Sequence, residues 1–163
     1  MNNIILTGFM GTGKTTIGRI LAERLNRPFI DTDDYITAQV GKTIPQIFAD
    51  SGEVGFRALE AQAARDLAAQ QGLVISTGGG MLVNDVNRQI LGASGLLVCL
   101  VARTEVIAGR LAHDTNRPLA SNWQVIYEAR RAVYASMPHQ IDTSDLPPHT
   151  LTEQIITLWQ QST

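Results

Sequence analysis

The sequence contains very little cysteine and no long apolar run. Its 163 residues include a single cysteine, Cys99, so an internal disulfide is impossible, and the apolar residues around it predict a buried structural thiol. No apolar segment approaches the roughly 20 residues of a membrane-spanning helix. The N-terminus also lacks the basic flank and apolar core of a secretory signal. We therefore expect a cytoplasmic protein that does not bind membranes.

Charged residues are also sparse, and neither sign dominates. They make up 17% of the chain, with 13 Lys and Arg against 15 Asp and Glu, for a net charge of −2. General nucleic-acid binders usually carry a basic surplus, so no nucleic-acid partner is expected, and any anion must be bound by a local arrangement of residues. Hydrophobic residues reach 44%, which is typical of a globular protein. The length predicts one domain, residues 1–163, which we expect to be a monomer.

The chain does contain a complete phosphate-binding pattern. Residues 8–15 read GFMGTGKT, which matches G-x-x-x-x-G-K-[ST], and they directly follow the apolar run of residues 4–6. In such a loop the backbone N–H groups surround the nucleotide phosphates, Lys14 reaches the β and γ oxygens, and the Thr15 hydroxyl ligates Mg²⁺. The loop opens a helix whose positive N-terminal end also faces the phosphates. The predicted nucleotide-binding residues of this segment are Gly11, Thr12, Gly13, Lys14, Thr15 and Thr16, and a seventh, Arg117, is predicted in a later loop.

Five apolar runs alternate with helical segments and predict a parallel sheet. Their hydrophobicity is continuous rather than alternating, which is typical of strands covered by helices on both faces. We therefore expect a three-layer α/β fold in which a five-stranded parallel sheet is flanked by helices. Thr150 and Glu153 form a capping-box pattern, and Gly41 is placed to end a short helix that starts at Asp34. The predicted strands span residues 3–7, 28–31, 73–77, 95–101 and 139–143.

Two stretches depart from the alternation of strand and helix. Residues 33–60 add helical pieces between the second and third strands, and residues 112–122 form a polar, basic loop. A substrate-binding insertion together with a mobile lid is the layout of a small-molecule kinase built on a phosphate loop. In this loop Arg117 precedes Pro118, and a mobile arginine could neutralise charge on a transferring phosphoryl group. The alternative for Arg117 is a solvent-exposed loop arginine.

Phosphoryl transfer needs an acidic residue near the metal in addition to the threonine of the loop. The third strand runs into the glycines at 78–80 without a carboxylate. The second strand ends in two acids, Asp31 and Asp33, at the sheet edge where ligands bind in open α/β folds, and alternation along an extended chain would point both the same way. We assign Asp31 to the magnesium shell and Asp33 to a substrate hydroxyl, whose proton it could accept. The alternative is that Asp33 or Asp34 caps the next helix.

A predicted helix over residues 123–137 carries an arginine on its apolar side. At about 100° per residue, Arg130 falls at the centre of the apolar stripe, where it would be largely desolvated. A guanidinium cannot shed its charge, so burial requires an anionic partner, and bidentate pairing suits a substrate carboxylate. The alternative partner is an internal acid such as Glu60. The stripe consists of Trp123, Ile126, Tyr127, Val133, Tyr134 and Met137.

Arg57 lies off the core face of another predicted helix, with Glu60 three residues further on and able to hold it. On its own this would be an ordinary surface pair, but together with Arg130 it could clamp one carboxylate. The glycines at 78–80 offer exposed N–H groups and room for a ligand to come close, the alternative being a plain glycine loop. The predicted substrate-binding residues are Asp33, Arg57, Gly78, Gly79, Gly80 and Arg130.

With these motifs in this order, the chain resembles shikimate kinase over nearly its full length. The resemblance implies a P-loop kinase fold and ATP-dependent phosphorylation of the 3-hydroxyl of shikimate, on the route to chorismate and the aromatic amino acids, with Mg²⁺ as cofactor. It also implies that Asp33 holds the ring hydroxyls, that the two arginines bind the carboxylate, and that Arg117 reaches the ATP phosphates. The matching residues are Gly8–Thr16, Asp31–Asp33, Ser51–Glu53 with Phe56, Arg57 and Glu60, Gly78–Gly80, Asn116–Leu119, and Arg130 four residues before Tyr134.

The chain departs from the family pattern in two places. Many members carry an arginine near a proline after the last strand, where it flanks adenine, and residues 144–149 have none. Ala120 stands where a larger apolar residue commonly follows the Arg-Pro-Leu of the lid. Two other functions stay open, a kinase for another hydroxy acid such as gluconate and a non-catalytic regulator that binds nucleotide or shikimate. The predicted catalytic residues Lys14, Asp33 and Arg117 argue against such a regulator.

Overall fold

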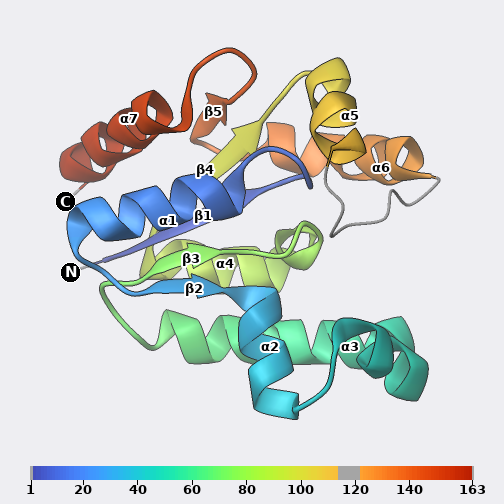
Figure 1. Ribbon diagram of the computed structural model, residues 1–163. Coiled ribbons are helices and arrows are strands. Elements are labelled where there is room, and N and C mark those ends of the chain that lie inside the picture. Colours follow the sequence, from blue (N-terminus) through green and yellow to red (C-terminus); the bar gives the residue numbers. More distant parts are fainter. Residues whose placement is uncertain (1, 114–121, 163) are drawn as a thin grey trace.

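The computed structural model describes residues 2–113 and 122–162, and a five-stranded sheet runs through its centre (Figure 1). The strand order is β2-β3-β1-β4-β5, and every neighbouring pair is parallel. Each strand begins and ends within one residue of its prediction, so the expected α/β fold with a parallel sheet is confirmed. The strands are β1 (Asn3–Gly8), β2 (Phe29–Asp31), β3 (Val74–Ser76), β4 (Gly95–Val101) and β5 (Gln140–Asp142).

Helices cover both faces of the sheet, which gives the three expected layers. Successive residues of β1 face opposite sides, because side chains alternate along a strand. Ile4 and Leu6 pack in one buried cluster with residues of α1 and α7, whereas Ile5 packs in the other with residues of α3 and α4. Figure 1 shows α1 in front of the sheet and α4 behind it. The helices are α1 (Lys14–Leu25), α3 (Ile44–Ala68), α4 (Asp85–Ser94) and α7 (Pro148–Gln161).

The start of α7 differs from the prediction. The helix begins at Pro148 with Pro147 as its N-cap and no side-chain cap, so the capping box assigned to Thr150 and Glu153 is wrong. Proline at the first helical position has a backbone already set for the helix and no N–H to satisfy. Glu153 instead forms an ion pair with Arg24 of α1, which joins the two helices on this face of the sheet.

The predicted insertion between the second and third strands consists of α2 (Thr32–Val40) and the first part of α3. As expected, α2 ends at Gly41, whose φ of 71° lies in the left-handed region. Thr43 and Gln46 then form a capping box at the start of α3. Gly52 kinks α3 with a φ of 65°, so the segment before it turns away from the long part that packs on the sheet.

Two further helices, α5 (Thr104–Ala112) and α6 (Trp123–Ala135), lead into and out of the loop predicted as a lid. Residues 114–121 of that loop, Arg117 among them, lie outside the described residues. The ring of Phe9, in the phosphate loop, packs against two rings of α6. Its centroid lies 6.2 Å from that of Trp123 and 5.3 Å from that of Tyr127. This packing fixes α6 against the phosphate loop.

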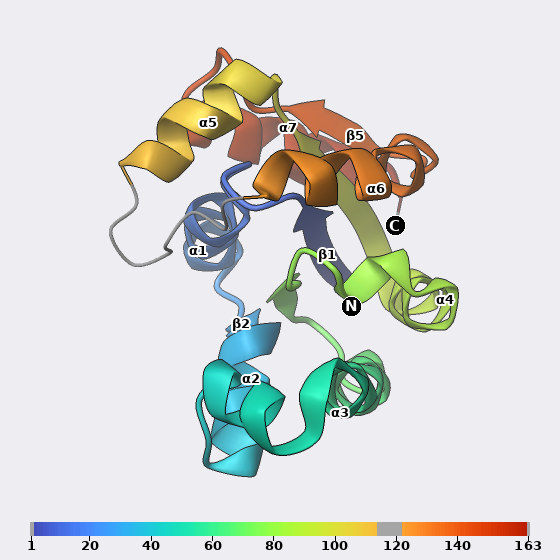
Figure 2. The same ribbon diagram turned by 90° about the vertical axis from the view of Figure 1, so that its right-hand side faces the viewer.

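The topology brings the loop after β1 and the loop after β3 together at the carboxyl edge of the sheet. From β1 the chain crosses to β2 on one side, and from β3 it crosses to β4 on the other, so the direction of winding reverses between the adjacent strands β1 and β3. Ligands of open α/β sheets bind at such a switch point. Figure 2 shows this edge between α2 and α3 at the bottom and α5 and α6 at the top.

Cys99 is completely buried, and burial raises the pKa of its thiol to about 11, as expected for a structural cysteine. No helix of the described residues has the length and apolar character that crossing a membrane requires.

Candidate active site

The phosphate loop has the backbone shape that its glycines predict. Gly8, Gly11 and Gly13 all have positive φ, at 136°, 80° and 98°, where other residues are strained. At Gly8 a side chain is excluded sterically as well, because a Cβ would lie 2.2 Å from the carbonyl oxygen of Leu100. The buried Lys14 ammonium donates to the carbonyl oxygens of Gly8 at 2.8 Å and Phe9 at 3.0 Å. The lysine therefore lies inside the curl of the loop.

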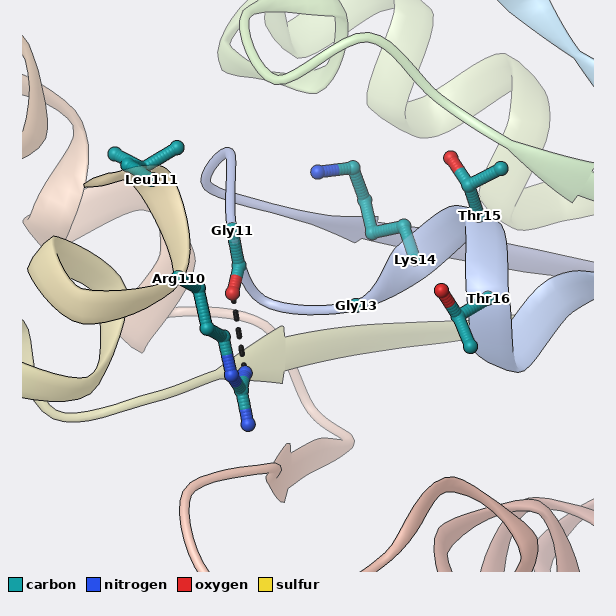
Figure 3. Close-up of a pocket in the computed structure, with 7 residues that line it drawn as sticks. All are labelled: Gly11, Gly13, Lys14, Thr15, Thr16, Arg110 and Leu111. Carbon is teal, nitrogen blue, oxygen red and sulfur yellow. Dashed lines mark hydrogen bonds between the residues drawn. The ribbon is translucent and has the colours of Figure 1, made fainter. Parts of the chain in front are cut away.

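A cavity of about 220 Å³ opens at this loop (Figure 3). Of the six nucleotide-binding residues predicted in this segment, five lie at its wall. The sixth, Thr12, is buried beneath it and donates its hydroxyl to the carbonyl of Phe9 at 2.7 Å. The cavity is lined by Gly11, Gly13, Lys14, Thr15, Thr16, Arg110 and Leu111.

Arg110 is a site residue that the sequence reasoning missed. It lies near the end of α5, and its guanidinium donates to the carbonyl of Gly11 at 3.1 Å and to the hydroxyl of Thr143 at 3.0 Å. It also donates to the carbonyl of Thr143. Nothing in its local sequence distinguishes Arg110 from a surface arginine, because the two segments that it joins are 33 and 99 residues away.

Asp31 at the end of β2 and Asp33 beyond it are placed differently from the prediction. The strand ends at Asp31, which caps α2, and its Oδ1 accepts the N–H of Asp33 at 3.0 Å and of Asp34 at 3.4 Å. Asp33 therefore lies in the first turn of a helix, and the strand alternation that we used to aim both acids the same way is wrong. The alternative capping residues, Asp33 and Asp34, are wrong as well. Asp31 takes this role because the chain turns directly into the helix.

Asp33 nevertheless reaches the glycine run after β3. A Cβ at Gly78 would lie 2.8 Å from Asp33 Oδ1 and 3.5 Å from Glu60 Oε1, so both carboxylates border this glycine. The N–H of Gly78 donates to the hydroxyl of the buried Thr32 at 2.9 Å, which ties the loop after β3 to the start of α2. The glycine run thus leaves open the space in front of two acids.

The two predicted carboxylate-binding arginines meet at the same glycine run. A Cβ at Gly80 would lie 2.8 Å from Arg57 Nη1 and 2.9 Å from Arg130 Nη2. A Cβ at Gly79 would lie 3.3 Å from Arg130 Nη1. Guanidinium groups from α3 and α6, 73 positions apart in the sequence, therefore converge on one point, as a clamp on a single anion requires.

The two arginines differ in their ion pairs: Arg57 has carboxylate partners, whereas Arg130 has none among the described residues. Arg57 Nη1 donates to Glu60 Oε2 at 2.7 Å, and its Nη2 lies 3.3 Å from an oxygen of the exposed Glu53. Burial raises the pKa of Glu60, whose side chain is only 2% exposed, and the hydrogen bond from Arg57 partly offsets this shift. For Arg130, no carboxylate of residues 2–113 or 122–162 lies within 4.0 Å, so the alternative of a direct Arg130–Glu60 ion pair is wrong, although the Arg130 charge still lowers the pKa of Glu60 slightly from further away.

The burial expected for Arg130 is only partly found. Its side chain is partly exposed instead of largely desolvated, although the apolar residues of the stripe lie in or pack against the buried core. Tyr134, one turn further along, is buried and donates its hydroxyl to the carbonyl of Gly79 at 2.6 Å. Burial raises the pKa of Tyr134 to about 12, which keeps this donor protonated. The hydrogen bond holds α6, and with it Arg130, against the glycine run.

The two halves of the site are in direct contact. A Cβ at Gly79 would lie 3.7 Å from the carbonyl oxygen of Gly8 and 3.9 Å from the backbone nitrogen of Met10, both in the phosphate loop. A loop for nucleotide phosphates thus adjoins a space bordered by two carboxylates and two guanidinium groups. This fold and site define a P-loop kinase that phosphorylates a small acidic acceptor.

Comparison with known proteins identifies the family. The sequence model of the shikimate kinase family matches residues 10–160. A shikimate kinase of Pelotomaculum thermopropionicum is 46% identical over 96% of this chain and 94% of its own, and one of Caldicellulosiruptor bescii is 39% identical over 97% and 95%. The chain belongs to the shikimate kinase family, and it is an enzyme that transfers a phosphoryl group from ATP to shikimate.

Solved structures agree with this assignment. The shikimate kinase of Acinetobacter baumannii, solved in complex with shikimate, superposes with a TM-score of 0.89 at 36% identity, covering 100% of this chain and 95% of that one. A gluconokinase of Sinorhizobium meliloti superposes with a TM-score of 0.65 at 17% identity, covering 98% and 94%. The second likeness concerns the fold alone, so it does not support the gluconate alternative.

Proposed function

We propose that the described site residues divide into a nucleotide half and an acid half. The phosphate loop binds the ATP phosphates through its N–H groups and Lys14. The Thr15 hydroxyl and Asp31 would hold Mg²⁺, which would neutralise part of the phosphate charge. This donor set suits magnesium, which prefers oxygen ligands and is usually held by one or two protein groups together with phosphates and water. Both hydrogen bonds that Asp31 accepts go to Oδ1, so Oδ2 can serve the ion or a water bound to it.

On the acid side, the shikimate carboxylate lies between Arg57 and Arg130, and a ring hydroxyl lies at Asp33. The observation that carries this proposal is the convergence of the two guanidinium groups at Gly80 while Asp33 borders Gly78. Gly78 thus marks a hydroxyl-binding end of the site and Gly80 a carboxylate-binding end, two residues apart in one glycine run. Arg57 shares its charge with Glu60, whereas Arg130 has no ion pair among the described carboxylates, so the pair keeps net positive charge for an anion.

In the reaction, the 3-hydroxyl oxygen of shikimate attacks the γ-phosphorus of ATP, and the bond from that phosphorus to the β–γ bridging oxygen breaks, leaving ADP. The hydroxyl proton passes to Asp33, and Lys14 neutralises charge on the phosphoryl oxygens. Arg117, which lies outside the described residues, would add a second cation from the lid. We further propose that the enzyme acts as a monomer in the cytoplasm, without a nucleic-acid or membrane partner.

Release of ADP from Mg²⁺–ATP, measured side by side with shikimate, quinate and gluconate, tests the proposal. We expect turnover with shikimate far above the background ATPase rate and little or none with gluconate, which has no ring to hold its hydroxyls near Asp33. If shikimate gave no turnover, the hypothesis of a non-catalytic regulator would be favoured. If gluconate were turned over faster than shikimate, the hypothesis of a kinase for another hydroxy acid would be favoured.

Substitution of Gly80 tests the convergence of the arginines. The backbone of Gly80 has a φ of −91°, which alanine adopts without strain, so Gly80→Ala adds only a methyl group between the guanidinium tips. We expect the melting temperature to change by no more than about 2 °C, because side-chain ends can move aside at little cost. The KM for shikimate should rise about tenfold or more, equivalent to about 1.4 kcal/mol, with the KM for ATP nearly unchanged.

The matched control for this substitution is Gly92→Ala in α4. A Cβ there would lie 3.9 Å from Leu97, an ordinary contact away from the site. Both kinetic constants should stay at their wild-type values in this variant. An unchanged KM for shikimate in Gly80→Ala would contradict the clamp.

A further inference from the structure

Thr143, directly after β5, joins three segments that are distant in the sequence. Its side chain is almost completely buried, and its hydroxyl donates to the carbonyl oxygen of Thr12 in the phosphate loop at 2.8 Å, with the carbonyl of Val101 also near at 3.3 Å. The same hydroxyl accepts a hydrogen bond from Arg110 Nη1 at 3.0 Å, and its backbone N–H donates to Val101 at 2.8 Å. Both the donor and the acceptor capacity of this one hydroxyl are therefore used.

This contact determines which way one peptide group of the phosphate loop faces. A trans peptide is planar, so its C=O and N–H point in opposite directions. The Thr12 carbonyl points to Thr143, and the N–H of the same peptide, which belongs to Gly13, therefore points away from Thr143 and across the loop. Gly13 has a φ of 98° and no side chain to restrain it, so its peptide could rotate if nothing held the carbonyl.

The preceding peptide is held in the same manner. The Gly11 carbonyl accepts from Arg110, and the N–H of that peptide, on Thr12, lies 3.4 Å from the Phe9 carbonyl that also accepts from Lys14. In Figure 3 the Gly11 oxygen and Arg110 lie on one side of the loop, and the Lys14 ammonium lies on the other. The N–H groups of Thr12 and Gly13 therefore both point away from Arg110 and Thr143, the side chains that hold the carbonyl groups of the same peptides.

We propose that Thr143 is a positioning residue of the phosphate loop. By holding the Thr12 carbonyl, it keeps the Gly13 N–H turned toward the space of the ATP phosphates before the nucleotide binds. Without this bond the loop must order its own peptide when it binds phosphate, and the buried Thr12 oxygen and Arg110 nitrogen lose a partner. This role rests on the proposed binding of ATP at the loop, and it assigns no contact between Thr143 and the nucleotide.

The test compares Thr143→Val, which keeps the shape but removes the hydroxyl, with Thr143→Ser, which keeps the hydroxyl. Titration calorimetry measures the Kd of Mg²⁺–ADP, and the Kd of shikimate in the absence of nucleotide reports whether the fold is kept. We expect Thr143→Val to raise the Kd of ADP about tenfold, Thr143→Ser to change it less than about threefold, and shikimate binding to stay unchanged. If Thr143→Val does not fold, Thr143→Ala replaces it, and its comparison with Thr143→Ser still isolates the hydroxyl.

Inorganic tripolyphosphate, tested with magnesium as a competitive inhibitor against ATP, separates the phosphate loop from contacts to the base. Its inhibition constant should rise in Thr143→Val about as much as the Kd of ADP. A loss confined to ADP would overturn the proposal, because it would assign Thr143 to the base-binding side, and so would an unchanged Kd of ADP.

Two further variants complete the experiment. Ser144→Ala is the matched control, since the described partners of the Ser144 hydroxyl are the N–H of Arg103 and the carboxylate of Asp142, neither of which belongs to the loop. It should bind ADP as the wild type does. Lys14→Ala tests the underlying site, because normal ADP binding in that variant would refute the proposed nucleotide site itself. Weak binding in Lys14→Ala together with normal binding in Thr143→Val would refute only the positioning role.

Discussion

Lys14→Ala is expected to lower kcat at least about 1000-fold, equivalent to about 4 kcal/mol of transition-state stabilisation. The ammonium is the one cation of the described phosphate loop, residues 8–15, and phosphoryl transfer concentrates charge on the oxygens that it would contact. Steady-state ADP release at saturating shikimate measures the loss. Shikimate binding, measured by calorimetry without nucleotide, should survive, because the arginines at Gly80 belong to other elements.

Lys14 also has a structural task, which must be separated from its catalytic one. Its ammonium donates to two loop carbonyls while 8% exposed, so its removal leaves two oxygens in the loop without this donor and should cost about 1–3 kcal/mol of stability. Assays are therefore made well below the melting temperature of the variant. Arg24→Ala, on the same helix and paired on the surface with Glu153, removes an equal charge and should keep normal kcat. A kcat for Lys14→Ala within about tenfold of the wild type would contradict the catalytic role.

Arg130→Ala is expected to raise the KM for shikimate about 100-fold, equivalent to about 2.7 kcal/mol, with a smaller change in kcat. Arg130 has no ion pair among the described carboxylates, so its charge is available to a substrate anion, whereas Arg57 already pairs with Glu60. Initial rates at varied shikimate and saturating ATP measure the effect.

A neutral substrate distinguishes charge pairing from simple packing in this variant. The amide of shikimate has the same shape but no charge, so the wild type should bind it weakly and Arg130→Ala should bind it almost equally weakly. Equal losses for the acid and the amide would refute the clamp. Arg131→Ala is the matched control, because this neighbour is 65% exposed and lies 3.7 Å from Glu128, and it should leave both substrates unaffected.

Several parts of the site were predictable because they depend on neighbours in the sequence. The phosphate loop is one contiguous segment that requires its glycines and lysine at fixed positions, and the strands can be recognised in the sequence as apolar runs. The predicted orientation of Asp31 and Asp33 was wrong, and the reason is local. The strand ends at Asp31 as predicted, but the helix begins at the next residue, so the extended conformation does not continue to Asp33, and the Asp31 side chain caps that helix.

Other parts depend on contacts that no local pattern contains. The burial of Glu60 follows from the packing of α3 under the glycine run, and it makes an expected surface pair into a partly buried one. Arg110 and Thr143 entered the site only when α5 and the end of β5 came beside the phosphate loop. Thr143 was the last residue of a predicted strand, at the ligand-binding edge of the sheet, which was a signal that could have drawn attention to it.

By itself, the sequence determined the class of fold, the phosphate loop and the residue types of an acid-binding site, because periodicity and short motifs encode local backbone shape. Only the tertiary structure decided that Arg57 and Arg130 converge at Gly80, that Glu60 pairs with Arg57 rather than with Arg130, and that Thr143 anchors the loop. Each of these contacts joins elements that the crossovers of the parallel sheet bring together. Such pairings depend on the packing of whole helices, so they follow from the folded chain and not from any single segment.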